Sequence, residues 1–549
     1  MALKKAHILL IKIIRILMLK NDKLLYVVVL YLFIHILITP LQLKAEPPDI
    51  NPWFKQAVLL KTYQQSYDWR IPWEKGKITT QTGMGLVVSL PESSESLSSE
   101  NFQSEKLYLM TTAELVANAT LIEATRRDIR VPFQAKLMRM DFAANLALIE
   151  INNAKFWNQL KPVEIYPIKS SKNDESESIY SLNIKSPDEW DLESGTIERM
   201  AVGHREKSDA WIPTLKISGL SKSRHGYPVL QDNKTVAMIL DSDRSGAKAM
   251  PAGMLLEFLQ RSGSDKFQSL THRGFRWRRL PQGSITDYFG IPEHKSGILI
   301  SQVLPHGTGS DVLKAGDYLT RIGKWELTHN GKINHPNWGI TLYDLLFLDQ
   351  YKAGDSVELS VIREKKTLIL HTKVKTYGND AHLVPLKRVG FSPRYIIQGG
   401  FLFQELTIDY LSIWGKNWRT RAPLRLRLFL EQNKTVMIPV INNYENNSDS
   451  NKKYSKQQSR VVLVTQVIPD AINIGYQNLS NAVVLKINDH SINSLVDVSE
   501  AFLKPKNEFH RIDFLPGSER MSAVLPEEKL EESNQRIKNN FRIPKLYSL

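Results

Sequence analysis

The sequence predicts a mainly β protein in which a large all-β region is followed by two smaller α+β modules. Between residues 53 and 267 the apolar runs are short, rich in β-branched residues and separated by turn residues, a pattern typical of β-barrels. The chain has 549 residues, which is too long for one hydrophobic core. At about 150 residues per domain, three or four domains are expected. The strand-like runs of the first region are residues 57–61, 85–90, 107–111, 135–140, 146–151 and 236–240.

A weak internal repeat indicates that the two smaller modules are related. The run Gln-Val-Leu-Pro at residues 302–305 recurs as Gln-Val-Ile-Pro at residues 466–469. In the first module, residues 340–348 have helical spacing, and residues 357–374 read as a hairpin. The polar runs 91–106 and 442–459 are expected to be surface loops, because they cannot bury enough apolar area to offset their ordering entropy.

These patterns predict five segments. They are an N-terminal signal or anchor (1–45), the all-β region (46–267), the first module (268–378), the second module (379–526) and a peripheral charged tail (527–549).

The composition excludes several classes of site. There is no cysteine, which rules out disulfides, thiol nucleophiles and cysteine-ligated metals. The net charge is +15, but residues 1–45 alone carry seven basic side chains and one acidic one. No zinc-finger, helix-turn-helix or RNP-like pattern accompanies the remaining basic runs, so no nucleic-acid partner is expected.

The N-terminus carries an export signal. A basic stretch ends at Lys23, and residues 24–39 are almost entirely apolar before Pro40 breaks the run. A small residue, Ala45, offers a cleavage-like site. Two alternatives remain open: a cleaved signal releasing the chain into the periplasm, or residues 24–43 as an uncleaved inner-membrane anchor facing it.

Three stretches carry a resemblance to a known family. Residues 67–73 (YDWRIPW) resemble its N-terminal Asp-aromatic…Pro-Trp segment, and residues 83–89 (GMGLVVS) resemble its Gly-Ser-Gly-Phe strand. Residues 249–259 resemble the Ile-Pro segment that closes its barrel. In order and spacing they resemble the HtrA/Deg family of serine proteases, in the branch with a diverged, Do-like C-terminal PDZ domain. The resemblance implies a trypsin-like double β-barrel followed by two PDZ-type domains.

The resemblance also identifies the positions of a catalytic triad, and all three hold other residues. In the stretch resembling the family's Leu-Thr-Asn-Ala-His-Val-Val turn, Glu114 stands at the histidine. In the stretch resembling its Asp-x-x-x-Asp-Leu-Ala run, Asn145 stands at the second aspartate. In the stretch resembling Gly-Asn-Ser-Gly-Gly-Pro, His225 stands at the serine, and Ser223 replaces the glycine two residues earlier.

The chemistry of acyl transfer makes these replacements decisive. A serine hydroxyl attacks only when an imidazole accepts its proton and an acid orients that imidazole. The glycine replaced by Ser223 would permit the backbone turn of an oxyanion hole. We therefore expect no catalytic residues and a degenerate protease site. Glu114 and His225 lack a third ligand at matching spacing, so neither a metal nor another cofactor is expected.

The first PDZ-type module offers a candidate peptide site. Arg273-Gly274-Phe275 resembles the loop whose backbone N–H groups hold a C-terminal carboxylate in PDZ domains. Arg273 stands where an apolar residue is usual and brings positive charge. The alternative is a purely structural module. The second module lacks an obvious carboxylate loop, and an assembly or regulatory role is expected for it.

The predicted function is that of an exported HtrA/Deg-like pseudoprotease that binds protein C-termini or unfolded polypeptides, in envelope quality control or scaffolding. The resemblance also implies a homo-oligomer built from trimers, with Tyr67, Trp69 and Trp73 either at its interface or in ordinary packing. Two alternatives stay open: an active serine-type endopeptidase with an unorthodox site, and a membrane-associated structural subunit.

Overall fold

The computed structural model describes the chain from Trp53 onward, with gaps. The described residues are 53, 56–91, 106–168, 178–184, 189–205, 208, 210–264, 267–281, 283–304, 307–336, 338–376, 382–386, 389–431 and 460–549. The predicted signal or anchor and the predicted loop at 442–459 lie outside them, as does most of the predicted loop at 91–106. Within this described part, no helix is long and apolar enough to cross a membrane.

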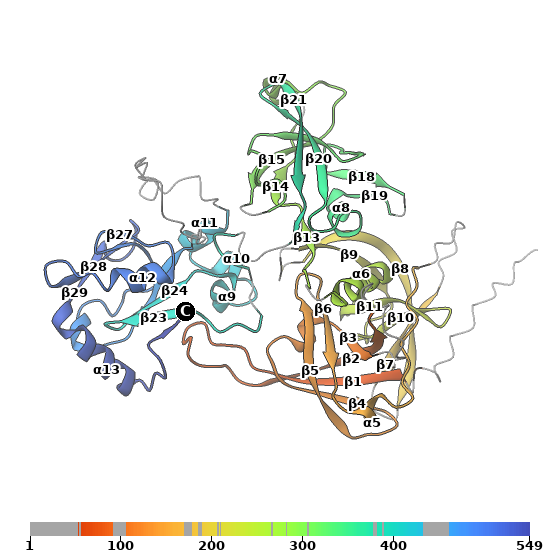
Figure 1. Cartoon of the computed structure of the whole chain (residues 1–549), viewed down its shortest axis with the longest axis horizontal. Helices are drawn as coiled ribbons and strands as arrows, with labels where there is room; N and C mark the ends of the chain where they lie inside the picture. Colours follow the sequence, from red (N-terminus) through yellow and green to blue (C-terminus); the bar gives the residue numbers. More distant parts are fainter. Residues whose placement is uncertain are drawn as a thin grey trace, which may run out of the picture. The chain divides into compact units, whose positions relative to one another are not determined.

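Two closed β-barrels form the N-terminal region (Figure 1). The strand order is β1-β2-β3-β6-β5-β4 in the first barrel and β10-β11-β12-β9-β8-β7 in the second. The elements of the first barrel are β1 (Ala57–Gln64), β2 (Thr79–Ser89), β3 (Leu107–Thr111), α4 (Ala113–Val116), β4 (Ala119–Arg126), β5 (Pro132–Asp141), β6 (Leu146–Glu150) and α5 (Ala154–Trp157). Those of the second are β7 (Ile179–Ile184), β8 (Trp190–Arg205), β9 (Ala210–Ser218), β10 (Pro228–Gln231), β11 (Lys234–Asp243), β12 (Gly246–Pro251) and the closing helix α6 (Ala252–Ser262).

The two barrels share a hydrophobic core. Met84 and Met110 of the first barrel are fully buried in the same cluster as Val229 and Met250 of the second. Along β9, buried and half-buried residues mostly alternate between Ala210 and Ser218, which gives this strand one face for the core. The strand-like runs predicted from the sequence lie in strands of the barrels, except for the last residues of two runs, Leu90 and Ile151.

The first α+β module is built on a sheet of order β14-β15-β16-β20-β21, with β14 at its edge. Its elements are β13 (Thr271–His272), β14 (Phe275–Arg278), α7 (Ser284–Phe289), β15 (Ile298–Val303), β16 (Tyr318–Ile322), β17 (Trp325–Glu326), β18 (Lys332–His335), β19 (Gly339–Leu342), η1 (Tyr343–Leu345), α8 (Leu346–Asp349), β20 (Ser356–Arg363), β21 (Lys366–Lys373) and β22 (Lys375–Thr376). The predicted hairpin is confirmed as β20 and β21. The helix expected over 340–348 begins only at Tyr343, because residues 339–342 pair with β18 as strand β19.

The second module has a longer sheet, of order β29-β28-β26-β25-β24-β23-β30. Its elements are β23 (Tyr395–Gln398), β24 (Phe401–Glu405), α9 (Ile408–Leu411), η3 (Ser412–Trp414), α10 (Trp418–Arg421), α11 (Leu424–Glu431), β25 (Val462–Val467), η4 (Ala471–Asn473), β26 (Ala482–Ile487), β27 (His490–Ser491), α12 (Leu495–Ala501), β28 (Phe509–Phe514), β29 (Ser522–Pro526), η5 (Glu527–Lys529), α13 (Leu530–Asn540) and β30 (Tyr547–Ser548).

The segment 527–549, expected as a peripheral tail, is part of this second module. Leu530 and Ile537 of α13 are buried in its hydrophobic clusters. The terminal strand β30 pairs with β23 through Tyr547 and Ile396. The charge of this segment lies on the exposed face of an amphipathic helix, and the composition alone concealed the buried face.

Two tryptophans of the stretch before β2 pack within the chain. Trp69 lies against the cluster that contains Tyr410 and Leu426, and the Trp73 ring lies 5.8 Å from that of Tyr395. Both partners belong to the second module. Intramolecular packing therefore accounts for these two residues.

Candidate functional site

The residue at the histidine position, Glu114, is held in an ion pair. It lies in the first turn of α4, and its carboxylate is 2.6 Å from the Nη2 atom of Arg205 on β8. The Glu114 and Arg205 side chains are only 19% and 10% exposed, so water screens the pair weakly. Burial lowers the pKa of Arg205, and the neighbouring carboxylate opposes that shift. Glu114 thus neutralises a buried cation.

The residue at the aspartate position, Asn145, serves the backbone of α4. Its Oδ1 atom accepts the N–H of Glu114 at 3.0 Å, and its carbonyl accepts the N–H of Ala113 at 3.1 Å. Its φ of 59° lies in the left-handed region, which asparagine tolerates better than most residues. Glu114 and Asn145 are therefore brought together, with the amide acting as a helix cap.

The residue at the serine position, His225, lies where the two barrels meet. Its carbonyl accepts the N–H of Met84 at 2.9 Å. The Met84 carbonyl in turn accepts the hydroxyl of Thr111 at 2.7 Å, and Thr111 stands three residues before Glu114. A side chain added at Gly83 would meet both His225 and Leu115. The three predicted positions thus lie on adjoining segments. Among the described residues, the buried Nδ1 atom of His225 has no hydrogen-bond partner.

The polar groups of the loop before His225 are hydrogen-bonded to a carboxylate of the same chain, that of Glu193. Glu193 of β8 accepts the N–H groups of Ser221 and Lys222 at 3.0 and 3.1 Å. It also lies 3.3 Å from the Ser221 hydroxyl and 3.4 Å from the hydroxyl of the buried Ser223. Neither hydroxyl faces an imidazole in these contacts. A carboxylate here binds the backbone donors at the entrance of the loop.

Asp141 ties the turn that carries Asn145 to the end of the barrel region. Its buried carboxylate accepts Arg261 of α6 at 2.8 Å, the Ser269 hydroxyl at 3.0 Å and the N–H of Ala144 at 3.1 Å. Removing one partner of such a buried charge is costly. We infer a structural role for Asp141.

The predicted peptide loop of the first module has the backbone shape expected of it. Gly274 has a φ of 76°, and a Cβ atom there would overlap Thr308 and Gly307. Its carbonyl accepts the N–H of Leu304 at 2.8 Å, which starts the pairing of β14 with β15. Glycine is therefore required at this position by both conformation and space.

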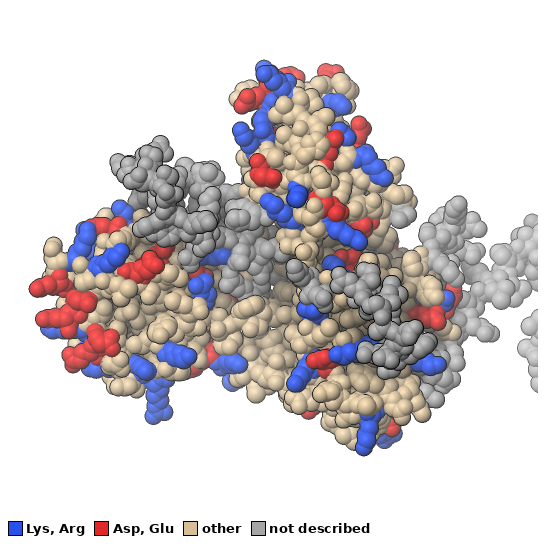
Figure 2. Space-filling model, in the orientation of Figure 1, with Lys and Arg blue, Asp and Glu red and all other residues tan. Residues whose placement is uncertain are grey.

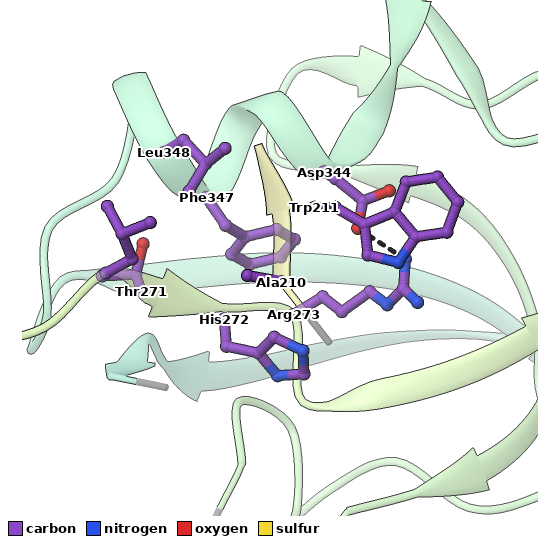
Figure 3. Close-up of a pocket in the computed structure, with 9 residues that line it drawn as sticks. Ala210, Trp211, Thr271, His272, Arg273, Asp344, Phe347 and Leu348 are labelled. Atoms are coloured by element: carbon purple, nitrogen blue, oxygen red, sulfur yellow. Dashed lines mark hydrogen bonds and ion pairs between the residues drawn. The ribbon is translucent and has the colours of Figure 1, made fainter. Parts of the chain in front are cut away.

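Side chains next to this loop form hydrogen bonds with its backbone N–H and carbonyl groups. Arg273 donates through Nε to the Phe275 carbonyl at 2.8 Å and pairs through Nη1 with Asp344 at 2.5 Å. The N–H of Gly274 donates to Nδ1 of His272 at 3.0 Å. Burial raises the pKa of Asp344, and Arg273 opposes that shift. Figure 3 shows the Arg273 guanidinium joined to Asp344 by a dashed line, with the Trp211 indole next to it and His272 near by.

A hollow of about 440 Å³ lies next to the edge strand. It combines aromatic rings with basic and titratable groups, and so suits an apolar side chain attached to a carboxylate. Its lining residues are His204, Trp211, His272, Arg273, Phe275, Arg276, Trp277 and Leu304.

In the second module the corresponding edge is covered. Strand β24 follows Gly400 as β14 follows Gly274, but β23 pairs along its outer edge from Tyr395 to Gln398. The N–H of Gly399 donates to Oδ1 of the buried Asn534 on α13 at 2.8 Å. The chain itself occupies the place where an added peptide strand would pair.

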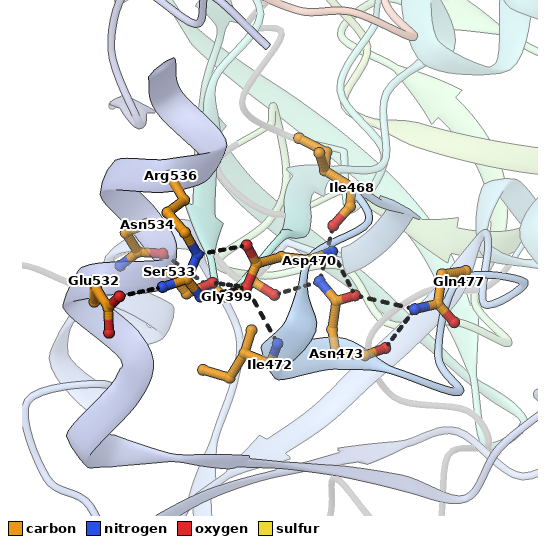
Figure 4. Close-up of polar contacts among 10 residues, drawn as sticks. All are labelled: Gly399, Ile468, Asp470, Ile472, Asn473, Gln477, Glu532, Ser533, Asn534 and Arg536. Carbon is orange, nitrogen blue, oxygen red and sulfur yellow. Dashed lines mark hydrogen bonds and ion pairs between the residues drawn. The ribbon is translucent and has the colours of Figure 1, made fainter. Parts of the chain in front are cut away.

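A polar network holds this arrangement together (Figure 4). Asp470 accepts two hydrogen bonds from Arg536 at 3.1 and 2.8 Å and one from the Ser533 hydroxyl at 2.8 Å. The bonds from Arg536 lower the pKa of Asp470 to about 2. Asn473 donates to the carbonyls of Gly399 and Ile468, both at 2.8 Å.

Neither a metal site in the described part of the chain nor a concentrated basic patch on the face drawn in Figure 2 is found. No group of three or more His, Cys, Asp or Glu side chains there is placed to hold a metal ion. On the face drawn in Figure 2, basic and acidic side chains are interspersed.

The sequence did not indicate that Arg205 and Glu193 contact these sites, nor that His272 accepts the N–H of Gly274. Arg205 and Glu193 lie 91 and 30 residues from the groups they bind, and no local pattern marks them. His272 stands directly before the predicted loop, and its spacing of two residues from Gly274 was the available signal.

The comparisons with known proteins cover most of the chain. A model of the PDZ domain matches residues 384–549. In Arabidopsis thaliana, the putative mitochondrial protease Do-like 3 is 22% identical over 487 residues, covering 87% of this chain and 76% of the relative. The chloroplastic protease Do-like 2 is 21% identical over 520 residues, covering 91% and 76%. A solved HtrA-type protease, AlgW with decapeptide, aligns over 59% of this chain and 96% of its own at 14% identity, with a TM-score of 0.41. Over most of its length the chain is therefore similar to Do-like proteases of the HtrA/Deg family, and its C-terminal part matches a PDZ domain.

Proposed function

We propose that this protein is a non-catalytic HtrA/Deg homologue that binds polypeptide C-termini through its first PDZ-type module. The observation that carries the proposal is the edge strand β14, which follows the Arg273-Gly274-Phe275 loop and pairs on one side only among the described strands. An extended peptide gains main-chain hydrogen bonds by adding to such an edge.

The geometry of the barrel site supports the non-catalytic half of the proposal. His225 supplies no hydroxyl, and the Glu114 carboxylate pairs with Arg205. Ser223 is buried and faces the Glu193 carboxylate. A carboxylate that neutralises a buried guanidinium is a weak proton acceptor, because taking a proton would leave that cation unpaired.

The binding half is tested with an array of decapeptides that differ in their last residue, each made with a free carboxylate and as an amide. The purified full chain should bind the decapeptides that have an apolar last residue and a free carboxylate. It should not bind the same decapeptides made as amides. Gly274→Glu should weaken binding by about a hundredfold or more, because it places a carboxylate at the loop. Gly316→Glu is the matched control, since Gly316 also has a positive φ but open space around it.

A folding defect of Gly274→Glu is separated from a binding defect by a second variant, Arg276→Glu. Arg276 lines the hollow from β14 and is half-buried, so a charge reversal there acts on the ligand with little effect on the core. Equal binding of amides and carboxylates, or unchanged binding by both variants, would contradict the proposal.

An active endopeptidase is the second candidate, favoured by the contact of the Ser223 hydroxyl with Glu193 and by His225 two residues further on. Casein cleavage and labelling by a serine-reactive fluorophosphonate distinguish the two. Cleavage abolished by Ser223→Ala would establish the enzyme. An intact substrate and an unlabelled serine are expected instead.

We further propose that the chain acts outside the cytoplasm, in periplasmic quality control or scaffolding, on the basis of residues 24–43. N-terminal sequencing of the protein recovered from its host distinguishes cleavage near Ala45 from a retained anchor. A trimer-based homo-oligomer is expected from the family, and light scattering of the full chain tests it.

A further inference from the structure

The N–H of Gly274, a donor that the proposed function assigns to a peptide carboxylate, is already bonded to an imidazole. Its partner is the Nδ1 atom of His272, at 3.0 Å. Because the backbone N–H donates, Nδ1 must be unprotonated, and the neutral ring carries its hydrogen on Nε2. The contact therefore exists only while His272 is neutral.

A carbonyl of the edge strand, that of Phe275, is likewise already hydrogen-bonded to a side chain. The Phe275 carbonyl accepts Nε of Arg273, and the same guanidinium is anchored by the buried carboxylate of Asp344 at 2.5 Å. The backbone of His272 is fixed independently, since its carbonyl accepts the Thr308 hydroxyl at 2.5 Å. The first module thus holds its own loop in a closed state through two side chains.

We propose that His272 is a proton-controlled competitor for the carboxylate site of the first module. This inference rests on the proposed function. Protonation of Nδ1 breaks the bond to Gly274, because a protonated nitrogen offers no lone pair to the N–H. The freed N–H then binds the terminal carboxylate of a peptide, and the imidazolium attracts that carboxylate as well.

The charges around His272 act in the same direction. Arg273 and Arg276 line the hollow with it, His204 lines the same hollow, and Lys375 is its strand partner. The acidic group that lines a pocket together with it is Asp344, which is paired with Arg273. In the closed state the charged side chains named here are mostly positive. An arriving carboxylate reverses that balance, so peptide binding and proton uptake reinforce each other.

The experiment measures the affinity of the full chain for a fluorescein-labelled decapeptide ending in phenylalanine, by fluorescence anisotropy between pH 5.5 and pH 8. An ordinary imidazole titrates near pH ~6.5. The wild-type chain should bind about fivefold or more tightly at pH 5.5 than at pH 8, the range expected for one coupled group.

Three variants assign the effect to His272. His272→Ala removes the competitor and should bind tightly at every pH. His272→Gln keeps an acceptor that does not titrate and should bind weakly at every pH. His294→Ala changes an exposed histidine of the same module and should retain the wild-type pH dependence.

The outcomes separate this inference from the proposed function. Carboxylate-dependent binding whose affinity does not change with pH, or whose affinity falls in His272→Ala at pH 8, overturns the role of His272 as a competitor. The proposed function is then unaffected. If the amidated decapeptide binds as tightly as the free-carboxylate one, both the proposed function and the role of His272 as a competitor are overturned.

Discussion

The two PDZ-type modules share one backbone design and use its edge differently. The N–H of Leu304 donates to the Gly274 carbonyl at 2.8 Å, and the N–H of Ile468 donates to the Gly400 carbonyl at 2.7 Å, so the repeat seen in the sequence is a structural one. In the first module the strand after the glycine is an edge, whereas in the second β23 covers it. The fold of the second module therefore persists although the edge of β24 is paired within its own chain.

The difference extends to the groups that satisfy each glycine loop. In the first module the acceptor is an imidazole on a half-buried side chain, which a proton or a ligand can displace. In the second it is a buried amide, Asn534, on a helix fixed by the network around Asp470. The proposed ligand binding therefore concerns the first module, whereas the edge of the second is occupied by contacts within the chain.

The largest effect on stability is expected from Gly400→Ala. Gly400 has a φ of 85°, and a Cβ atom there would overlap the Ile468 carbonyl and the Asn473 amide. We expect a loss of about 2–4 kcal/mol in the free energy of unfolding of the second module. Urea denaturation followed by tryptophan fluorescence measures it. Gly517→Ala is the control, since its φ is 87° in open space, and should lose about 1 kcal/mol.

A smaller loss is expected when the acceptor of the loop N–H is removed from each module. Asn534→Ala leaves the buried N–H of Gly399 unbonded and should cost about 1–3 kcal/mol. His272→Ala should cost less than about 1 kcal/mol, because the His272 side chain is half-buried whereas that of Asn534 is buried. Denaturation of both variants under one set of conditions checks the order. The reverse order would show that the loop of the second module is the more accessible one.

An effect of similar size to that of Asn534→Ala is expected from Asp470→Asn, and it depends on pH. The folded chain lowers the pKa of Asp470 to about 2, against about 3.9 in an unfolded chain. The stability that this carboxylate contributes is therefore present above pH ~4 and is lost as the pH falls through about 2. Asp470→Asn should cost about 1–2 kcal/mol at pH 7 and close to nothing near pH ~2. A cost that stays constant across this range would rule out the charged contact with Arg536 as its source.

Much of the fold was predictable because it is encoded locally. The short alternating runs of the barrels, the hairpin of β20 and β21 and the repeated Gln-Val-x-Pro runs each lie within a few residues. The covering of β24 was not predictable, since β23 and the buried face of α13 carry no signal of what they pack against. Asn534 lies 135 residues from the N–H that it accepts.

The candidate site follows the same rule. The structure brings Glu114 and Asn145 into contact and sets His225 on an adjoining segment, while their catalytic incompetence stays a prediction. The sequence did not indicate that Arg205 neutralises Glu114 or that Glu193 fills the loop before His225, because those contacts exist only once β8 is folded.

One measurement tests the central claim most directly. The purified full chain is mixed with the fluorescein-labelled decapeptide ending in phenylalanine, and anisotropy and peptide mass are followed in the same sample. The account predicts saturable binding that is lost in Gly274→Glu, with the decapeptide intact after prolonged incubation. Fragments that disappear in Ser223→Ala would contradict it, since the barrel would then contain a working nucleophile.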